Sequence, residues 1–167
     1  DGIANEEAIK GAVCTWGKDG FAEGADLTML ETAGKEYARR AKADGKEAAM
    51  RPFVDGTKQL SLVYRRLETC GKPVAAAING VCMGGGLELA LACHYRIAVN
   101  DDKTRLGFPE VNLGIFPGFG GTGRSIRQAG PVEAMQAMLT GRLIRASAAQ
   151  RMGPRDKLLR HRGTLPW

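Results

Sequence analysis

The chain has 167 residues, of which 44% are hydrophobic and 25% are charged, and its formal net charge is +6. These values are ordinary for one globular domain with its own core, and no apolar run approaches the roughly 20 residues that a membrane span needs. Most of the excess charge lies between Arg151 and Trp167, where five basic side chains face one acidic one. No aromatic side chains alternate with these basic residues, so we expect no nucleic-acid surface.

The cysteines and histidines are too few and too scattered for a zinc site. The two histidines are His94 and His161, and no two of the four cysteines form a CxxC pair. Free thiols in a chain without a secretory signal indicate a reducing compartment, which predicts a cytoplasmic protein. The opening "DGIANEEAIK" is polar and lacks an initiator Met, as in a segment of a longer chain.

The first half of the chain predicts one short strand followed by two helices. The apolar run "AVCTW" at 12–16 is bounded by glycines and predicts a buried strand. An Ala-, Lys- and Glu-rich segment at 27–50 predicts a helix, which we expect Pro52 to end. A second helix is predicted at 53–70, because Leu60, Val63, Tyr64 and Leu67 recur at helical spacing.

The second half alternates strands and helices, which is typical of an α/β fold. Strands are predicted at 74–78, 95–99 and 105–108, and a helix at 85–93. Two short helices are expected at 132–139 and 146–152. We see no boundary that would divide the chain into two domains.

The glycine cluster "GFGGTG" at 118–123 matches two phosphate-binding patterns poorly. A dinucleotide site needs an acidic residue about 20 positions later, and none lies between Ala134 and Arg155. A phosphate loop needs Lys where this chain has Arg124. A tight turn that leads into a helix is therefore the better interpretation.

The segment "NGVCMGGGLELALACH" at 79–94 places three glycines before an apolar helix. The first N–H groups of a helix lack partners within the helix and lie at the positive end of its dipole. Such a turn suits an anion or a developing oxyanion, although glycine can also serve close packing alone. Glu88 in this helix and Glu110 in "FPEVNLG" would add two carboxylates for acid/base chemistry beside a carbonyl.

Four segments together resemble the enoyl-CoA hydratase/isomerase (crotonase) family, and the likeness runs from about Ala12 to Gly153. They are "FAEGADL", "KPVAAAINGVCMGGGLELALACHYRIA", "RLGFPEVNLGIFPGFGGT" and "TGRLIRASAAQRMG". The resemblance implies the ββα superhelix of the ClpP/crotonase fold, incomplete at both ends. It is greatest to the hydratase domain of bacterial multifunctional fatty-acid oxidation proteins. Residues 1–153 would form a partial domain and 154–167 an altered basic tail, in which Pro154 and Arg155 should prevent the family's next strand.

The resemblance also assigns roles to individual residues. Glu88 and Glu110 would be the catalytic pair that holds a water, while backbone N–H groups of Ala25 and Gly85 would form the oxyanion hole. The substrate would contact a set of residues that adjoin these turns, namely Ala25, Asp26, Leu27, Thr28, Gly85 and Gly118, and Gly118 would help to position the water. No metal and no cofactor are implied, because the acyl-CoA thioester is itself the substrate.

The leading functional expectation is hydration of a trans-2-enoyl-CoA in fatty-acid β-oxidation. A double-bond isomerase remains open, although one carboxylate suffices for that reaction and this chain has two. An inactive acyl-CoA-binding or assembly fragment also remains open. The resemblance further implies a trimer-based oligomer or a place in a multifunctional β-oxidation protein, and a chain that is marginally stable without its flanking segments.

Overall fold

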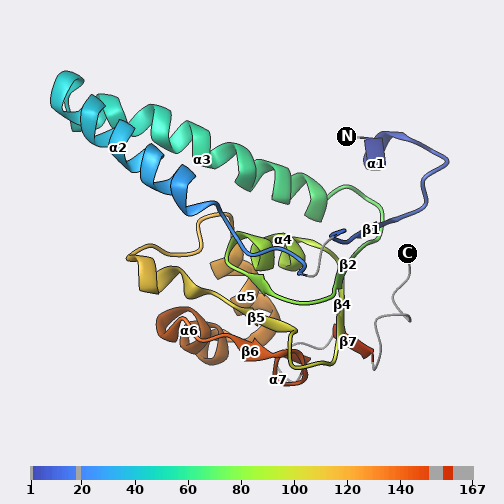
Figure 1. Cartoon of the computed structure of the whole chain (residues 1–167). Coiled ribbons are helices and arrows are strands. Elements are labelled where there is room, and N and C mark those ends of the chain that lie inside the picture. Colours follow the sequence, from blue (N-terminus) through green and yellow to red (C-terminus); the bar gives the residue numbers. More distant parts are fainter. Residues whose placement is uncertain (1, 18–19, 151–155, 160–167) are drawn as a thin grey trace.

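The computed structural model describes residues 2–17, 20–150 and 156–159. Two small sheets and the helices around them form a body, from which a long helical hairpin projects (Figure 1). The order of elements after the hairpin alternates strands with helices, as the sequence predicts.

One sheet is parallel and has the strand order β1-β2-β4-β7. Its members are β1 (Ala12–Cys14), β2 (Val74–Ile78), β4 (Tyr95–Val99) and β7 (Asp156–Leu159). The two central strands pair from Ala75 with Tyr95 to Ile78 with Ala98. β2 is a short apolar run with four of its five residues buried, whereas β4 also carries the buried Arg96 and the exposed Tyr95.

The second sheet has the order β3-β5-β6 and lies beside the first. It contains β3 (Cys82–Met83), β5 (Arg105–Gly107) and β6 (Ile144–Arg145). After β2 the chain enters β3 and then helix α4 (Gly85–Ala92), and after β4 it enters β5. Each pass thus contributes one strand to each sheet, which is the ββ(α) repeat expected from the resemblance.

The core lies between the parallel sheet and α4. It is built from buried apolar side chains: Phe21, Val74, Ala76, Ile78, Cys82, Leu87, Ala90, Cys93, Ala98, Leu106, Phe108 and Ala146. Three short helices complete the body, α5 (Gly121–Ala129), α6 (Pro131–Thr140) and α7 (Ala146–Gln150). Helix α5 begins inside "GFGGTG", so the prediction of a turn that leads into a helix is confirmed. A four-residue helix α1 (Gly2–Asn5) lies near the start of the chain.

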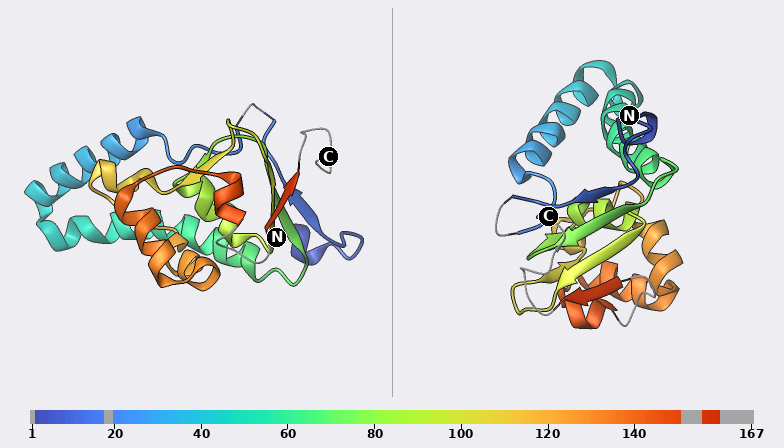
Figure 2. Two further views of the ribbon diagram at one scale, coloured as in Figure 1. Left: turned by 90° about the horizontal axis from the view of Figure 1, so that it is seen from below. Right: turned by 90° about the vertical axis from the view of Figure 1, so that its right-hand side faces the viewer.

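The projecting hairpin consists of α2 (Leu27–Asp44) and α3 (Lys46–Glu68) (Figure 2). The prediction that Pro52 ends the first helix is wrong. The break is at Gly45, whose φ of +89° suits glycine, and Pro52 lies inside α3. Proline removes one backbone donor, but this stretch is exposed, so water can bind the carbonyl that loses its partner.

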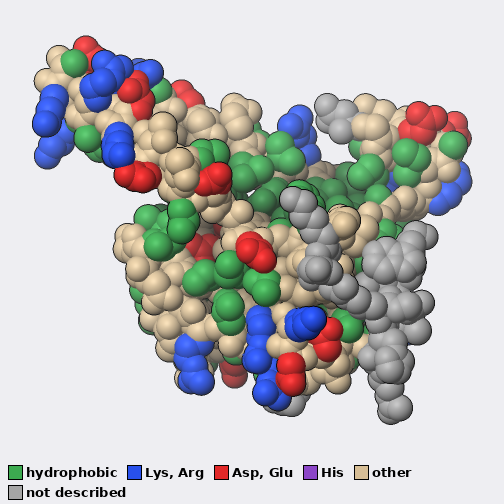
Figure 3. All heavy atoms as spheres, in the orientation of Figure 1, with side chains coloured by type: hydrophobic (Ala, Val, Ile, Leu, Met, Phe, Trp, Pro, Cys, Tyr) green, Lys and Arg blue, Asp and Glu red, His purple; other side chains and the backbone are tan. Residues whose placement is uncertain are grey.

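The hairpin is nearly free of buried side chains. In α3 only Ala49 and Tyr64 are buried, and in α2 none is. Basic side chains gather at its far end, where residues 39–46 include Arg39, Arg40, Lys42 and Lys46 (Figure 3). The body-proximal end of α3, by contrast, packs against α4 and the turns beside it.

The expectation that no strand follows Met152 is also wrong. β7 pairs in parallel with β4, with Ile97 opposite Lys157 and Val99 opposite Leu159. The backbone of an open sheet edge accepts a strand that is not wholly apolar, since the pairing uses main-chain groups. The remainder of the basic tail, residues 151–155 and 160–167, lies outside the described residues.

Candidate active site

The turn from β3 into α4 is built for close backbone approach. Gly84 has φ +54° and its N–H donates to the Gly107 carbonyl at 3.0 Å, so this turn is tied to β5. Gly85 is the first residue of α4, which leaves its N–H at the open, positive end of the helix. A Cβ on Gly86 would lie 2.5 Å from the Ala22 Cβ, so this position requires glycine.

The segment before α2 lies against this turn. The Met83 N–H donates to the Ala22 carbonyl at 2.9 Å, and Ala22 forms a parallel bridge with Cys82. A Cβ on Gly24 would lie 3.7 Å from the Gly85 nitrogen. The two turns that contain Ala25 and Gly85 therefore adjoin each other.

Glu88 lies one turn into α4 and its side chain is only 1% exposed. Its Oε1 accepts hydrogen bonds from the Phe119 N–H at 2.7 Å and from the Gly121 N–H at 2.8 Å. A Cβ on Gly121 would lie 2.6 Å from the Glu88 Cγ. Glycine at this position thus lets the loop close over the carboxylate.

Glu110 approaches the same helix end from the 3₁₀ helix η1 (Pro109–Leu113). It is 8% exposed, and a Cβ on Gly84 would lie 3.3 Å from its Oε1. Its Oε2 is buried and has no hydrogen-bond partner among the described residues. The fold therefore holds one oxygen of Glu88 firmly and leaves one oxygen of Glu110 available.

Both carboxyl groups are harder to ionise than an exposed glutamate. Burial raises the pKa of Glu88, and the charge of Glu110 acts in the same direction. The N–H groups of Gly121 and Phe119 and the charge of Arg124 oppose this rise. Burial also raises the pKa of Glu110, against a hydrogen bond from its own backbone. Raised carboxyl pKa values bring these groups closer to the range useful for proton transfer at neutral pH.

The other predicted site residues lie around this centre. Asp26 caps α2, with its Oδ1 accepting from the Thr28 N–H at 2.7 Å, and Leu27 is 62% exposed at the start of that helix. The Gly118 carbonyl accepts a hydrogen bond from the Ser61 hydroxyl at 3.2 Å. Gly118 thus precedes the two residues whose N–H groups bind Glu88.

Sequence reasoning missed Phe119 and Gly121. Both residues lie in "GFGGTG", and the sequence pattern of this motif indicates only a turn that leads into a helix. Nothing local in that motif shows which side chain its N–H groups meet, because Glu88 is 31 and 33 residues away along the chain.

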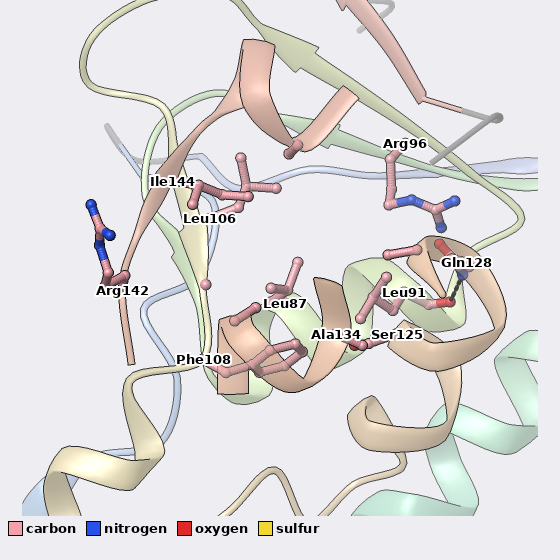
Figure 4. Close-up of a pocket in the computed structure, with 14 residues that line it drawn as sticks. Leu87, Leu91, Arg96, Leu106, Phe108, Ser125, Gln128, Ala134, Arg142 and Ile144 are labelled. Atoms are coloured by element: carbon pink, nitrogen blue, oxygen red, sulfur yellow. Dashed lines mark hydrogen bonds between the residues drawn. The ribbon is translucent and has the colours of Figure 1, made fainter. Parts of the chain in front are cut away.

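A separate cavity of about 90 Å³ lies on another side of α4 (Figure 4). Leu87, Leu91, Leu106, Phe108, Ala134 and Ile144 point toward it, and Gln128 donates to the Leu91 carbonyl at its edge. Neither Glu88 nor Glu110 lines this cavity. The cavity is therefore not part of the carboxylate site.

Residues 2–17, 20–150 and 156–159 are the part of the chain that the structure describes. No group of three or more His, Cys, Asp or Glu side chains there is arranged to hold a metal ion. None of the helices there combines the length and hydrophobicity that crossing a membrane requires.

A buried carboxylate pair beside a glycine turn at a helix N-terminus, on two sheets connected by ββα passes, is the arrangement of the crotonase-type fold. Residues 2–161 match the enoyl-CoA hydratase/isomerase family, and the chain belongs to that family.

Individual relatives narrow the comparison further than the family does. The chain is 43% identical over 159 residues to the fatty acid oxidation complex subunit alpha of Shewanella loihica, and 45% identical over 152 residues to that of Shewanella frigidimarina. These alignments cover 94% and 90% of this chain but only 20% and 19% of those proteins. The crystal structure of an enoyl-CoA hydratase from Bacillus anthracis matches with a TM-score of 0.74 and 33% identity, covering 95% of this chain and 55% of that one. The chain thus spans about a fifth of its curated relatives and about half of this solved structure.

Proposed function

We propose that this chain carries an enoyl-CoA hydratase site, which adds water to a trans-2-enoyl-CoA in fatty-acid β-oxidation. The observation that carries the proposal is the pair of buried carboxylates, Glu88 and Glu110, at the N-terminal end of α4. Membership of the family and the names of the relatives support the choice of substrate.

The proposed chemistry balances without a redox partner or a cofactor. The thioester oxygen binds the N–H groups of Ala25 and Gly85, which stabilise negative charge on that oxygen as the double bond is attacked. One carboxylate takes a proton from water as the water oxygen bonds to C3. The other carboxyl group, in its protonated form, delivers a proton to C2, and the product is a 3-hydroxyacyl-CoA. Residues 26–28 and Gly118 would line the path of the thioester.

The two glutamates have different roles in this proposal. Glu88, held at one oxygen by two N–H groups, keeps a fixed position for the water. Glu110, whose Oε2 has no partner among the described residues, is the less constrained of the two acid/base groups.

This asymmetry also favours a second candidate, a double-bond isomerase that moves one proton with Glu110 alone. Crotonyl-CoA and a trans-3-enoyl-CoA, assayed side by side by absorbance and product chromatography, separate the two reactions. Turnover of crotonyl-CoA to the 3-hydroxy product supports hydration, whereas conversion of only the 3-enoyl substrate supports the isomerase. Binding of acyl-CoA by calorimetry without turnover of either substrate would indicate a binding or assembly role.

The wider setting is proposed from the relatives. We expect the site to act on an acyl-CoA substrate within a multifunctional fatty-acid oxidation protein, or in a trimer-based oligomer. The free thiols Cys14, Cys70, Cys82 and Cys93 are consistent with the cytoplasm.

A further inference from the structure

The body-proximal end of α3 contacts both halves of the carboxylate site. Tyr64 is 7% exposed, and its hydroxyl donates to the Gly85 carbonyl at 3.0 Å. Its ring meets the Phe119 ring edge to face, with centroids 6.0 Å apart. Burial raises the pKa of Tyr64 to about 12, with the charge of Glu88 adding to the effect, so the hydroxyl remains a donor at neutral pH.

One turn further along α3, Glu68 binds three arginines that differ greatly in exposure. The side chains of Arg65 and Arg127 are 62% and 65% exposed, but that of Arg124 is only 5% exposed. Partial burial opposes the charge of Glu68, yet hydrogen bonds from Arg65 and Arg124 keep its pKa below the usual range. Burial of a guanidinium is offset only where acceptors meet its donors, and the Nε of Arg124 has no hydrogen-bond partner among the described residues.

The second terminal nitrogen of Arg124 donates a hydrogen bond to the loop that binds Glu88. Its Nη2 contacts Glu68 at 3.1 Å, and its Nη1 donates to the Phe119 carbonyl at 2.8 Å. A Cβ on Gly120 would lie 2.6 Å from that Nη1, so the guanidinium packs directly on the loop backbone.

The three peptide groups of this loop are consecutive. The first contributes the Phe119 N–H to Glu88, and its own carbonyl, that of Gly118, is bound by Ser61 of α3. The second contributes the Phe119 carbonyl to Arg124. The third contributes the Gly121 N–H to Glu88. Arg124 therefore fixes the middle peptide, whose neighbours on both sides hold the carboxylate.

We infer that α3 positions the catalytic groups through Tyr64 and through the Glu68–Arg124 pair. These side chains act on Gly85 and Glu88 through the backbone and do not touch the substrate, so they are positioning residues. The inference rests on the proposed hydratase function.

The test compares Arg124→Met with Arg127→Met in the intact protein. Both changes remove an arginine from Glu68, but only Arg124 also holds the loop. We expect Arg124→Met to lower kcat for crotonyl-CoA hydration by roughly 10- to 100-fold with little change in KM, because small misplacements of catalytic groups cost about that much. Arg127→Met should stay within about twofold of wild type. Arg124→Lys should recover part of the loss, since its ammonium can reach one of the two acceptors.

Tyr64→Phe gives an independent variant, should Arg124→Met fail to fold. It keeps the ring against Phe119 and removes only the hydrogen bond to Gly85, so we expect a fall in kcat of several-fold without loss of the folded state. Wild-type kcat in both Arg124→Met and Tyr64→Phe would overturn the inference, as would equal losses in Arg124→Met and Arg127→Met.

Amide hydrogen exchange separates this inference from the proposed function. Peptides that span residues 119–121 should exchange at least about tenfold faster in Arg124→Met than in wild type or Arg127→Met, because the loop loses its central hydrogen bond. Unchanged exchange would show that Arg124 does not fix the loop, whatever the activity. Absence of hydration by the wild type, with the expected exchange, would refute the hydratase assignment and leave the positioning role standing.

Discussion

Glu88 and Glu110 are both buried, but their hydrogen-bonding environments differ. Two backbone N–H groups fix one oxygen of Glu88, whereas the Oε2 of Glu110 has no partner among the described residues. A carboxylate buried without a full set of partners is destabilising. Such an arrangement is retained where the group performs chemistry.

Replacement of either glutamate by glutamine should remove most of the activity. Gln keeps the size of the side chain and can still accept the hydrogen bonds from Phe119 and Gly121, but it cannot exchange a proton with water. We expect Glu88→Gln and Glu110→Gln each to lower crotonyl-CoA hydration by about 10²- to 10⁴-fold, with little change in the affinity for acyl-CoA measured by calorimetry. Glu133→Gln, in the exposed first turn of α6, is the matched control. Near-normal turnover in either site variant would exclude that residue from the mechanism.

The raised pKa of Glu88 also predicts a pH dependence of stability. The folded state holds this proton more tightly than the unfolded state does, so its contribution is complete below the ordinary pKa of about 4.5 and is lost as the pH rises through the higher folded-state pKa. The Tm of wild type should therefore fall relative to that of Glu88→Gln from about pH 4.5 upward and then level off. About 1 kcal/mol corresponds to roughly 2–4 °C for a domain of this size. A Tm difference that does not vary between pH 4 and 8 would contradict the assignment.

At the scale of elements, α4 depends on one close approach to the segment before α2. A side chain at Gly86 would collide with Ala22, whereas Gly34 in exposed α2 has no atoms near its Cβ position. Replacing Gly86 by alanine should therefore lower the stability of the protein, whereas replacing Gly34 by alanine should raise it.

Gly86→Ala should destabilise the protein by about 1–3 kcal/mol, because it overpacks a rigid backbone contact. Gly34→Ala should stabilise it by up to about 1 kcal/mol, since alanine is the better helix former and meets no obstacle. Urea unfolding of both variants measures the difference. Changes of the same sign would mean that the contact between α4 and Ala22 is looser than the structure indicates.

At the scale of the whole molecule, large apolar side chains remain exposed on the body. Phe116 is 77% exposed, Leu139 66%, Val132 62% and Met135 48%. Three of these lie on α6. Val132, Met135 and Leu139 share one face of that helix by their spacing, and exposed apolar surface of this kind is typical of an interface.

We expect the 167-residue chain to self-associate in a concentration-dependent way. The double variant Phe116→Ser with Leu139→Lys should reduce the association severalfold, because it places polar groups on that surface. Light scattering over a hundredfold range of concentration measures the effect. Wild-type chain that stays monomeric throughout would show that these residues do not drive association.

Much of this molecule followed from local sequence patterns. The strands at 74–78 and 95–99 and the helix that starts at Gly85 were predictable, because short, mostly apolar runs between turn-forming residues have few alternatives in an α/β chain. Glu88 and Glu110 could be singled out in the same way, since each lies beside a glycine turn.

Other features depended on contacts between distant segments. The hairpin breaks at Gly45 and α3 continues through Pro52, where the exposed backbone lets water bind the carbonyl that loses its donor. β7 forms because the open edge of β4 supplies its hydrogen bonds, although its own residues include Asp156 and Lys157. Only the tertiary structure shows which N–H groups bind Glu88. It also shows that Tyr64 and Arg124 contact the backbone around the site. Hydrogen bonds between residues 21 to 56 positions apart leave no periodic trace in a sequence, because their geometry exists only once the elements have packed.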